Sequence, residues 1–188
     1  MAKIFFTVGA LSLLLLGCAS IAPMEVKEEK LGKSVPVITQ SFASPEIRPL
    51  DTWEVYLKAS DADGDMKSLY AEIFQPGLGT YPVSITRIKE ADSKELNGYF
   101  YLNTGDDPGM NFKNLTLTVN IQDKAGHFSA PVVFPLAFNE RSVQQAPPPG
   151  VFQAKDLGPI MVTLRSSDDG DHEEGRGRDR GPVRRRFR

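Results

Sequence analysis

The amino-acid sequence predicts an all-β fold: a single antiparallel β-sandwich of about seven strands, formed by residues 35–139. Three observations predict it. Short runs alternate apolar and polar residues, which is the period of a strand with one buried face. Clusters of Gly, Pro, Asp and Asn separate these runs and favour turns. No segment carries a convincing apolar stripe with a period of 3.6 residues, so helices are not expected to build the core.

The clearest strand is the run Leu-Thr-Leu-Thr-Val-Asn-Ile-Gln at residues 115–122, in which the four apolar side chains share one face. A second run, residues 53–59, likewise turns Trp53 and Leu57 to one side. Proline in the last run favours an edge strand or a bulge, because proline donates no backbone hydrogen bond. The other strands are expected near residues 36–43, 67–75, 81–88, 98–103 and 130–138.

The N-terminal end carries an export signal. Lys3 precedes an apolar stretch from Ile4 to Leu16, which is too short for a spanning helix of about 20 residues. Cys18, the only cysteine, follows directly after Leu-Leu-Leu-Leu-Gly. This motif resembles the signal of bacterial lipoproteins. The resemblance implies that residues 1–17 are removed and that the Cys18 thiol carries a diacylglycerol with acyl chains such as palmitate.

Two or more acyl chains anchor a protein stably, so the resemblance implies membrane attachment through the lipid. Ala19 follows the cysteine where Asp would signal retention, and this implies export to the periplasm and attachment to the outer rather than the inner membrane. The alternative is an ordinary secretory signal cut near Ala19-Ser20, with an incidental Cys18. A single cysteine excludes an intrachain disulfide, so the core alone must stabilise the domain.

The segments around the sandwich differ in composition. Residues 18–34 are polar and predict a lipidated tether, and residues 140–157 are a proline-rich linker. Residues 158–165 alternate again. They either return to the sandwich as an additional edge strand, which we expect because an isolated strand cannot bury its face, or pair with a partner.

Residues 166–188 are predicted to be a disordered charged tail, acidic first and then basic. Its two halves either neutralise each other in solvent, or the basic half binds an anionic surface such as lipopolysaccharide or phospholipid. Nucleic acid is not an expected partner of an envelope protein. The basic half contains Arg176, Arg178, Arg180, Arg184, Arg185, Arg186 and Arg188.

Two stretches carry a resemblance to a fold family. Residues 58–73 contain Asp-Ala-Asp-Gly-Asp between two predicted strands, and residues 119–131 join the last two strands of the domain. Both resemble bacterial immunoglobulin-like, cadherin-like and PKD-type domains. The resemblance implies an immunoglobulin-like sandwich of the disulfide-free bacterial type, because there is no cysteine pair and Trp53 falls on the second strand rather than the third.

An acidic turn is the candidate metal site. Asp61, Asp63 and Asp65 alternate along a glycine-containing turn, and Ca²⁺ prefers such oxygen ligands. In an immunoglobulin-like sandwich this turn lies at the same end as Asp123, so all four are candidate ligands. The alternative is that Asp and Gly simply form a good turn. In cadherins, related aspartates bind Ca²⁺ between successive domains, whereas this chain has one such domain.

The sequence predicts no enzyme. Neither His127 nor His172 has a second ligand at metal-binding spacing, and no nucleophile-elbow, phosphate-loop or dinucleotide motif is present. We predict a non-catalytic binding or structural module without a cofactor other than Ca²⁺. Its alternatives are an accessory subunit of an envelope or secretion complex, and a calcium-dependent carbohydrate or adhesion binder.

Overall fold

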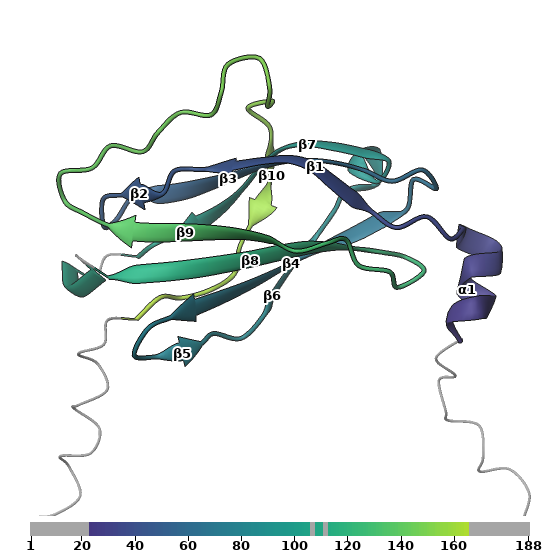
Figure 1. Cartoon of the computed structure of the whole chain (residues 1–188), viewed down its shortest axis with the longest axis horizontal. Coiled ribbons are helices and arrows are strands. Elements are labelled where there is room, and N and C mark those ends of the chain that lie inside the picture. Colours follow the sequence, from purple (N-terminus) through teal and green to yellow (C-terminus); the bar gives the residue numbers. More distant parts are fainter. Residues whose placement is uncertain (1–22, 106–107, 111–112, 166–188) are drawn as a thin grey trace, which may run out of the picture.

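The computed structural model describes residues 23–105, 108–110 and 113–165, which form two β-sheets stacked face to face (Figure 1). The first sheet has the order β1 (Val37–Ala43), β3 (Thr52–Ser60), β7 (Glu95–Asn103) and β10 (Asp156–Pro159). The second has the order β2 (Glu46–Ile47), β9 (Val132–Phe138), β8 (Asn114–Asp123), β4 (Met66–Gln75) and β5 (Gly79–Thr80), with β6 (Ser84–Arg87) also paired to β4. Three short helices accompany them: α1 (Met24–Leu31), η1 (Glu90–Asp92) and η2 (Pro108–Met110).

Alternating side chains explain why these segments are strands. In β8, Leu115, Leu117, Val119 and Ile121 are buried, and the residues between them are partly exposed. In β3, Trp53, Val55, Leu57 and Ala59 face the same core. Burial of one face of each sheet against the other is the main stabilising contribution of such a sandwich.

Trp53 lies fully buried in this core. Its indole Nε1–H donates to the backbone carbonyl oxygen of Ser44 at 2.8 Å, and its ring meets Phe134 edge-on with centroids 6.5 Å apart. The tryptophan therefore connects the two sheets without leaving its polar group unpaired.

The prediction of a two-sheet sandwich is confirmed, but its details were wrong in two respects. The described residues form ten strands, whereas about seven were expected. The structure also contains two parallel pairs, β2 with β9 and β10 with β7, so the sheets are mixed and not purely antiparallel. The extra strands are mostly of two to four residues, which is too short for an alternating pattern to reveal.

The flanking segments also differ from the expectation. Within the predicted tether, residues 24–31 form the helix α1, although its sequence lacks an apolar stripe. The last strand, β10, begins at Asp156 inside the predicted linker and ends at Pro159. Cys18 and the predicted charged tail, residues 166–188 with its seven arginines, lie outside the described residues.

Residues 156–165 cross from one sheet to the other. β10 pairs with β7 in the first sheet, and the Ile160 N–H donates to the Tyr101 carbonyl oxygen at 2.7 Å. The chain then reaches the second sheet, where the Met161 N–H donates to Ser84 Oγ at 2.7 Å and the Arg165 N–H donates to the Tyr81 hydroxyl at 3.1 Å. We call residues 156–165 the C-terminal clasp.

A glycine permits the clasp to approach β7. A Cβ at Gly98 would lie 2.4 Å from the backbone carbonyl oxygen of Lys155 and 2.9 Å from the side chain of Leu157. Any larger residue at position 98 would therefore push β10 away from its neighbour.

α1 lies at one end of the sandwich, and the C-terminal clasp runs from the middle of the sandwich toward the other end (Figure 1). Among the helices of the described residues, none is long and apolar enough to cross a membrane.

Candidate metal centre

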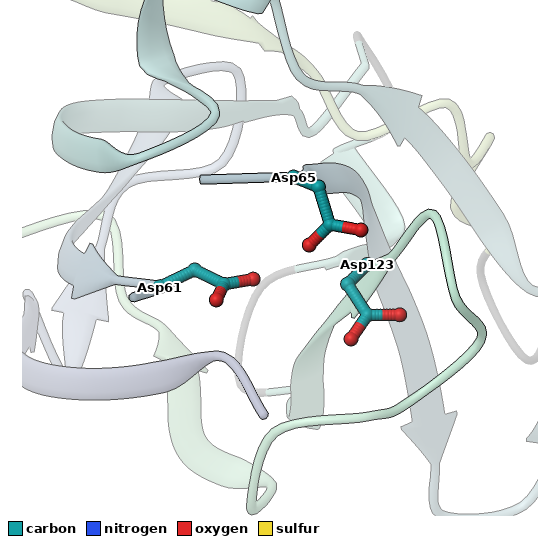
Figure 2. Close-up of side chains that lie close together, drawn as sticks. All are labelled: Asp61, Asp65 and Asp123. Atoms are coloured by element: carbon teal, nitrogen blue, oxygen red, sulfur yellow. The ribbon is translucent and has the colours of Figure 1, made fainter. Parts of the chain in front are cut away.

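Three buried aspartates meet at the end of the sandwich near α1. Asp61 follows β3 directly, Asp65 precedes β4, and Asp123 is the last residue of β8. Carboxylate oxygens of all three lie within 4.8 Å of one another, and the residues are 3%, 6% and 1% exposed. Figure 2 shows Asp61 and Asp65 turned toward each other with Asp123 beside them.

The strand pattern places these carboxylates inside the sandwich. Asp61 continues the core-facing series of β3 two residues after Ala59, and Asp123 continues that of β8 two residues after Ile121. The antiparallel register of β4 and β8 sets Met66 opposite Asp123, which brings the neighbouring Asp65 to the same place. Polar residues thus occupy positions where the alternation calls for apolar ones.

Hydrogen bonds satisfy only part of this cluster. Asp123 Oδ1 accepts from the backbone N–H groups of Gly126 and His127, and its Oδ2 lies 2.7 Å from His127 Nδ1. Asp61 Oδ1 accepts from the Asp63 N–H at 3.0 Å. In contrast, Oδ2 of Asp61 and Oδ2 of Asp65 are buried and have no hydrogen-bond partner.

The titration of Asp65 reflects this environment. Its pKa rises to about 6, first because burial disfavours the charged form, then through a hydrogen bond with Asp61 and the negative charges of Asp123 and Asp61. That hydrogen bond requires a proton on one of the two carboxyls. When both are ionised at neutral pH, nothing in the described residues compensates the two unpartnered oxygens, and only a proton or a cation would do so.

The donor set selects the kind of cation. All three side chains offer carboxylate oxygens, which suit hard ions rather than the thiophilic transition metals. Ca²⁺ binds oxygen at about 2.3–2.6 Å, so its ligand sphere is about 5 Å across and accommodates oxygens spread over up to 4.8 Å. Mg²⁺ binds oxygen at about 2.0–2.1 Å and requires a tighter set.

The structure separates Asp63 from the other predicted ligands. Asp63 is exposed, and its Oδ2 accepts from the Ser34 N–H at 2.7 Å. The nearby acidic residues of η1 are also engaged elsewhere: Glu90 Oε1 lies 2.9 Å from Lys124 Nζ, and Asp92 forms an ion pair with Lys155. The candidate centre therefore consists of Asp61, Asp65 and Asp123.

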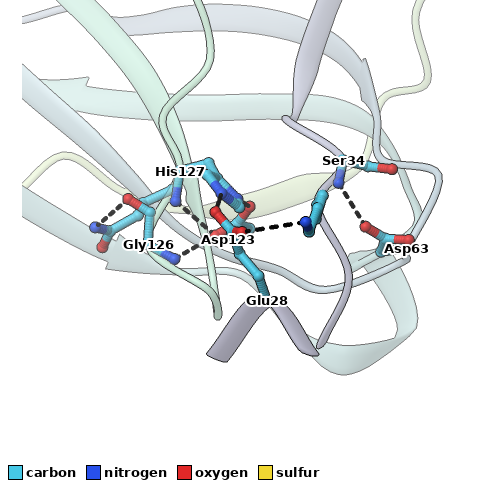
Figure 3. A network of polar contacts seen from close by, with 8 residues as sticks. Glu28, Ser34, Asp63, Asp123, Gly126 and His127 are labelled. Atoms are coloured by element: carbon cyan, nitrogen blue, oxygen red, sulfur yellow. Dashed lines mark hydrogen bonds and ion pairs between the residues drawn. The ribbon is translucent and has the colours of Figure 1, made fainter. Parts of the chain in front are cut away.

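A histidine connects the centre to α1. His127 Nδ1 faces Asp123, and its Nε2 lies 3.0 Å from Glu28 Oε1 (Figure 3). The pKa of His127 is raised, first by the hydrogen bond to Glu28 and then by the one to Asp123. The sequence does not reveal this bridging role of His127, because Glu28 is 99 residues away along the chain.

A second polar feature lies on the outer face of the first sheet. A groove of about 760 Å³ runs between β1, β3, β7 and the segment before β10. The polar lining of the groove comprises Thr39, Gln40, Lys58, Ser60, Asp92, Glu95, Asn97 and Gln153. Further along the same two strands, Tyr56 packs against Tyr99 with centroids 5.4 Å apart, and Phe152 packs against Tyr56 at 5.6 Å.

The chain has few recognisable similarities to known proteins. No protein-family model matches the sequence, and no curated protein matches it. Among solved structures, the chain is similar to the fibronectin(III)-like modules of Clostridium thermocellum CbhA, with 12% sequence identity and a TM-score of 0.35. The match covers 61% of this chain and 51% of that one, so this chain spans about half the length of that structure.

Proposed function

We propose that this chain is a lipid-anchored protein of the bacterial cell envelope, whose immunoglobulin-like sandwich serves as a non-catalytic, calcium-binding module. One observation carries the calcium part: two carboxylate oxygens, on Asp61 and Asp65, are buried without a partner beside a third carboxylate. Burial of an uncompensated charge is costly, and a divalent cation removes that cost.

Support for the anchor comes from the sequence. Cys18 occupies the one position that a lipoprotein signal requires, and only four residues separate it from Pro23, the first described residue. The lipid would hold the sandwich at the membrane, in the outer membrane rather than the inner, with the acidic end attached to the tether. Recognition would then fall to the exposed surfaces of the sandwich.

Calcium binding is tested by isothermal titration calorimetry on the full-length protein in detergent at pH 7.5, after removal of metals with EDTA. We expect saturable heat with Ca²⁺ and weaker binding of Mg²⁺. Asp65→Asn should abolish this heat, whereas Glu72→Gln, at an exposed position of β4 outside the cluster, should leave it. Absence of heat at millimolar Ca²⁺ would refute the calcium site.

The anchor is tested separately by mass spectrometry of the mature N-terminus. We expect a mature chain that begins at Cys18 and carries two or three acyl chains. Cys18→Ser should move the protein from the membrane to the soluble fraction. An unmodified Cys18 in the mature protein would contradict the anchor without affecting the calcium site.

The groove on the first sheet favours one second candidate, a carbohydrate binder. Its amide and hydroxyl side chains both donate and accept hydrogen bonds, as sugar hydroxyl groups do. Retention of the protein on envelope glycans that is lost in Asn97→Ala would support this role. Recovery of one stoichiometric protein partner would instead support an accessory subunit.

A further inference from the structure

We propose that a cation bound by Asp61, Asp65 and Asp123 locks the N-terminal tether segment, residues 24–34, onto the sandwich. This inference rests on the proposed calcium site and assigns it a role. The site would control how the sandwich is held relative to the lipid anchor.

Two polar contacts attach the tether segment to the sandwich, and both are made by the loops that form the site. The loop 61–65 supplies two of the three carboxylates, and its Asp63 accepts from the Ser34 N–H at 2.7 Å. The loop after β8 supplies Asp123, and its His127 lies 3.0 Å from Glu28 of α1. Figure 3 shows the two attachments side by side.

Apart from these two loops, little of the sandwich covers the described tether residues. No residue of α1 is buried, and its first turn has no side-chain cap. The chain also passes Asp63 so closely that a Cβ at Gly32 would lie 2.1 Å from the carboxyl carbon of Asp63. A helix of eight residues with so few contacts is marginal by itself, so its position depends on the two loops.

The charges of the site couple the two loops. Three ionised carboxylates within 4.8 Å repel each other, and this repulsion favours conformations in which the two loops move apart. A divalent cation reverses the effect, because it attracts all three carboxylates to one point. The loop arrangement that binds the cation is then the one that presents Asp63 and His127 to the tether.

Two binding events that require the same conformation strengthen each other, and the coupling is reciprocal. Ca²⁺ should therefore hold the tether more firmly, and a docked tether should raise the affinity for Ca²⁺. On the membrane, a docked tether would fix the orientation of the sandwich relative to the lipid anchor. An undocked tether would lengthen the flexible connection and let the sandwich reorient.

The experiment is hydrogen–deuterium exchange of the full-length protein in detergent at pH 7.5, with EDTA or with saturating Ca²⁺. We expect amide exchange in residues 26–34 to slow at least threefold in Ca²⁺. Exchange in the middle of β8, residues 115–121, serves as the internal control and should not change.

Matched variants separate docking from simple charge. Glu28→Gln removes the contact with His127, whereas Glu90→Gln removes a carboxylate at the same end that pairs with Lys124 instead of joining α1 to the sandwich. We expect Glu28→Gln to abolish the calcium-dependent protection and to weaken Ca²⁺ binding three- to tenfold more than Glu90→Gln does.

The outcomes are distinct. If Ca²⁺ binds in calorimetry but leaves exchange in residues 26–34 unchanged, the lock is refuted and the calcium site stands. Equal effects of the two glutamate variants on affinity would also refute the lock, since charge alone would explain them. If Ca²⁺ does not bind at all, the proposed site and the lock both fall.

Discussion

Replacement of Asp65 by asparagine should make the metal-free protein more stable at neutral pH. The carboxyl of Asp65 has a pKa of about 6 in the folded state against an ordinary value of 3.8. Because the folded pKa is raised, the folded state binds more protons than the unfolded state between these values, and stability falls as pH rises through that window. The difference of about 2 pKa units corresponds to about 3 kcal/mol at pH 7.5.

Asparagine keeps the shape of the side chain and removes the charge. In EDTA at pH 7.5, Asp65→Asn should therefore raise the free energy of unfolding by up to about 3 kcal/mol, which corresponds to about 10 °C in Tm for a domain of this size. The gain should shrink to about half at pH 5 and to about a fifth at pH 4, and it should vanish only below about pH 3, where the wild-type carboxyl is protonated in both states. His127 changes stability in the same direction with pH, because its pKa is also raised, but it is present in both proteins.

Thermal melts followed by circular dichroism at pH 4, 5, 6 and 7.5 measure this effect, each in EDTA and in Ca²⁺. Ca²⁺ at 100 times its Kd should stabilise the wild type by about 2.7 kcal/mol and leave Asp65→Asn unchanged. Glu72→Gln is the control, and the exposed side chain of Glu72 predicts a change below about 0.5 kcal/mol. A variant Asp65→Asn that melts lower than wild type in EDTA at pH 7.5 would refute the electrostatic reasoning.

Three further predictions concern the fold. Leu117→Ala removes a fully buried side chain and should cost about 2–5 kcal/mol in urea denaturation, and a loss below 1 kcal/mol would contradict the core position. Gly98→Ala should raise amide exchange in residues 152–160, because its Cβ would meet a backbone oxygen at 2.4 Å; unchanged exchange would contradict this. Tyr81→Phe removes the hydroxyl that donates to Gln75 Oε1 at 2.6 Å and accepts from the Arg165 N–H of the clasp at 3.1 Å. It should lower the free energy of unfolding by about 1–3 kcal/mol in the same urea assay. An unchanged midpoint would show that these hydrogen bonds are dispensable.

The sequence allowed the main strands to be predicted because their alternation is strong. The run at 115–122 lies within β8, and the run at 53–59 lies within β3. The parallel pairs could not be predicted, because β2 and β10 are two and four residues long and their partners lie far away in the chain. The helix α1 could not be predicted from an apolar stripe, because none of its residues is buried and its sequence therefore has no such stripe.

The acidic cluster was predicted only in outline. Turn composition pointed equally to Asp61, Asp63 and Asp65, since all three alternate along the turn. A finer signal was available: Asp61 and Asp123 each stand two residues beyond a core-facing apolar residue, at the next position of the buried face. Nothing in the sequence identified the contact between Glu28 and His127, because it depends on where the tether folds back.

The C-terminal clasp has a consequence for folding during synthesis. It joins the two sheets through residues that are made last among those of the sandwich. A chain that leaves the ribosome from its N-terminus therefore cannot form these contacts until residue 165 has been added.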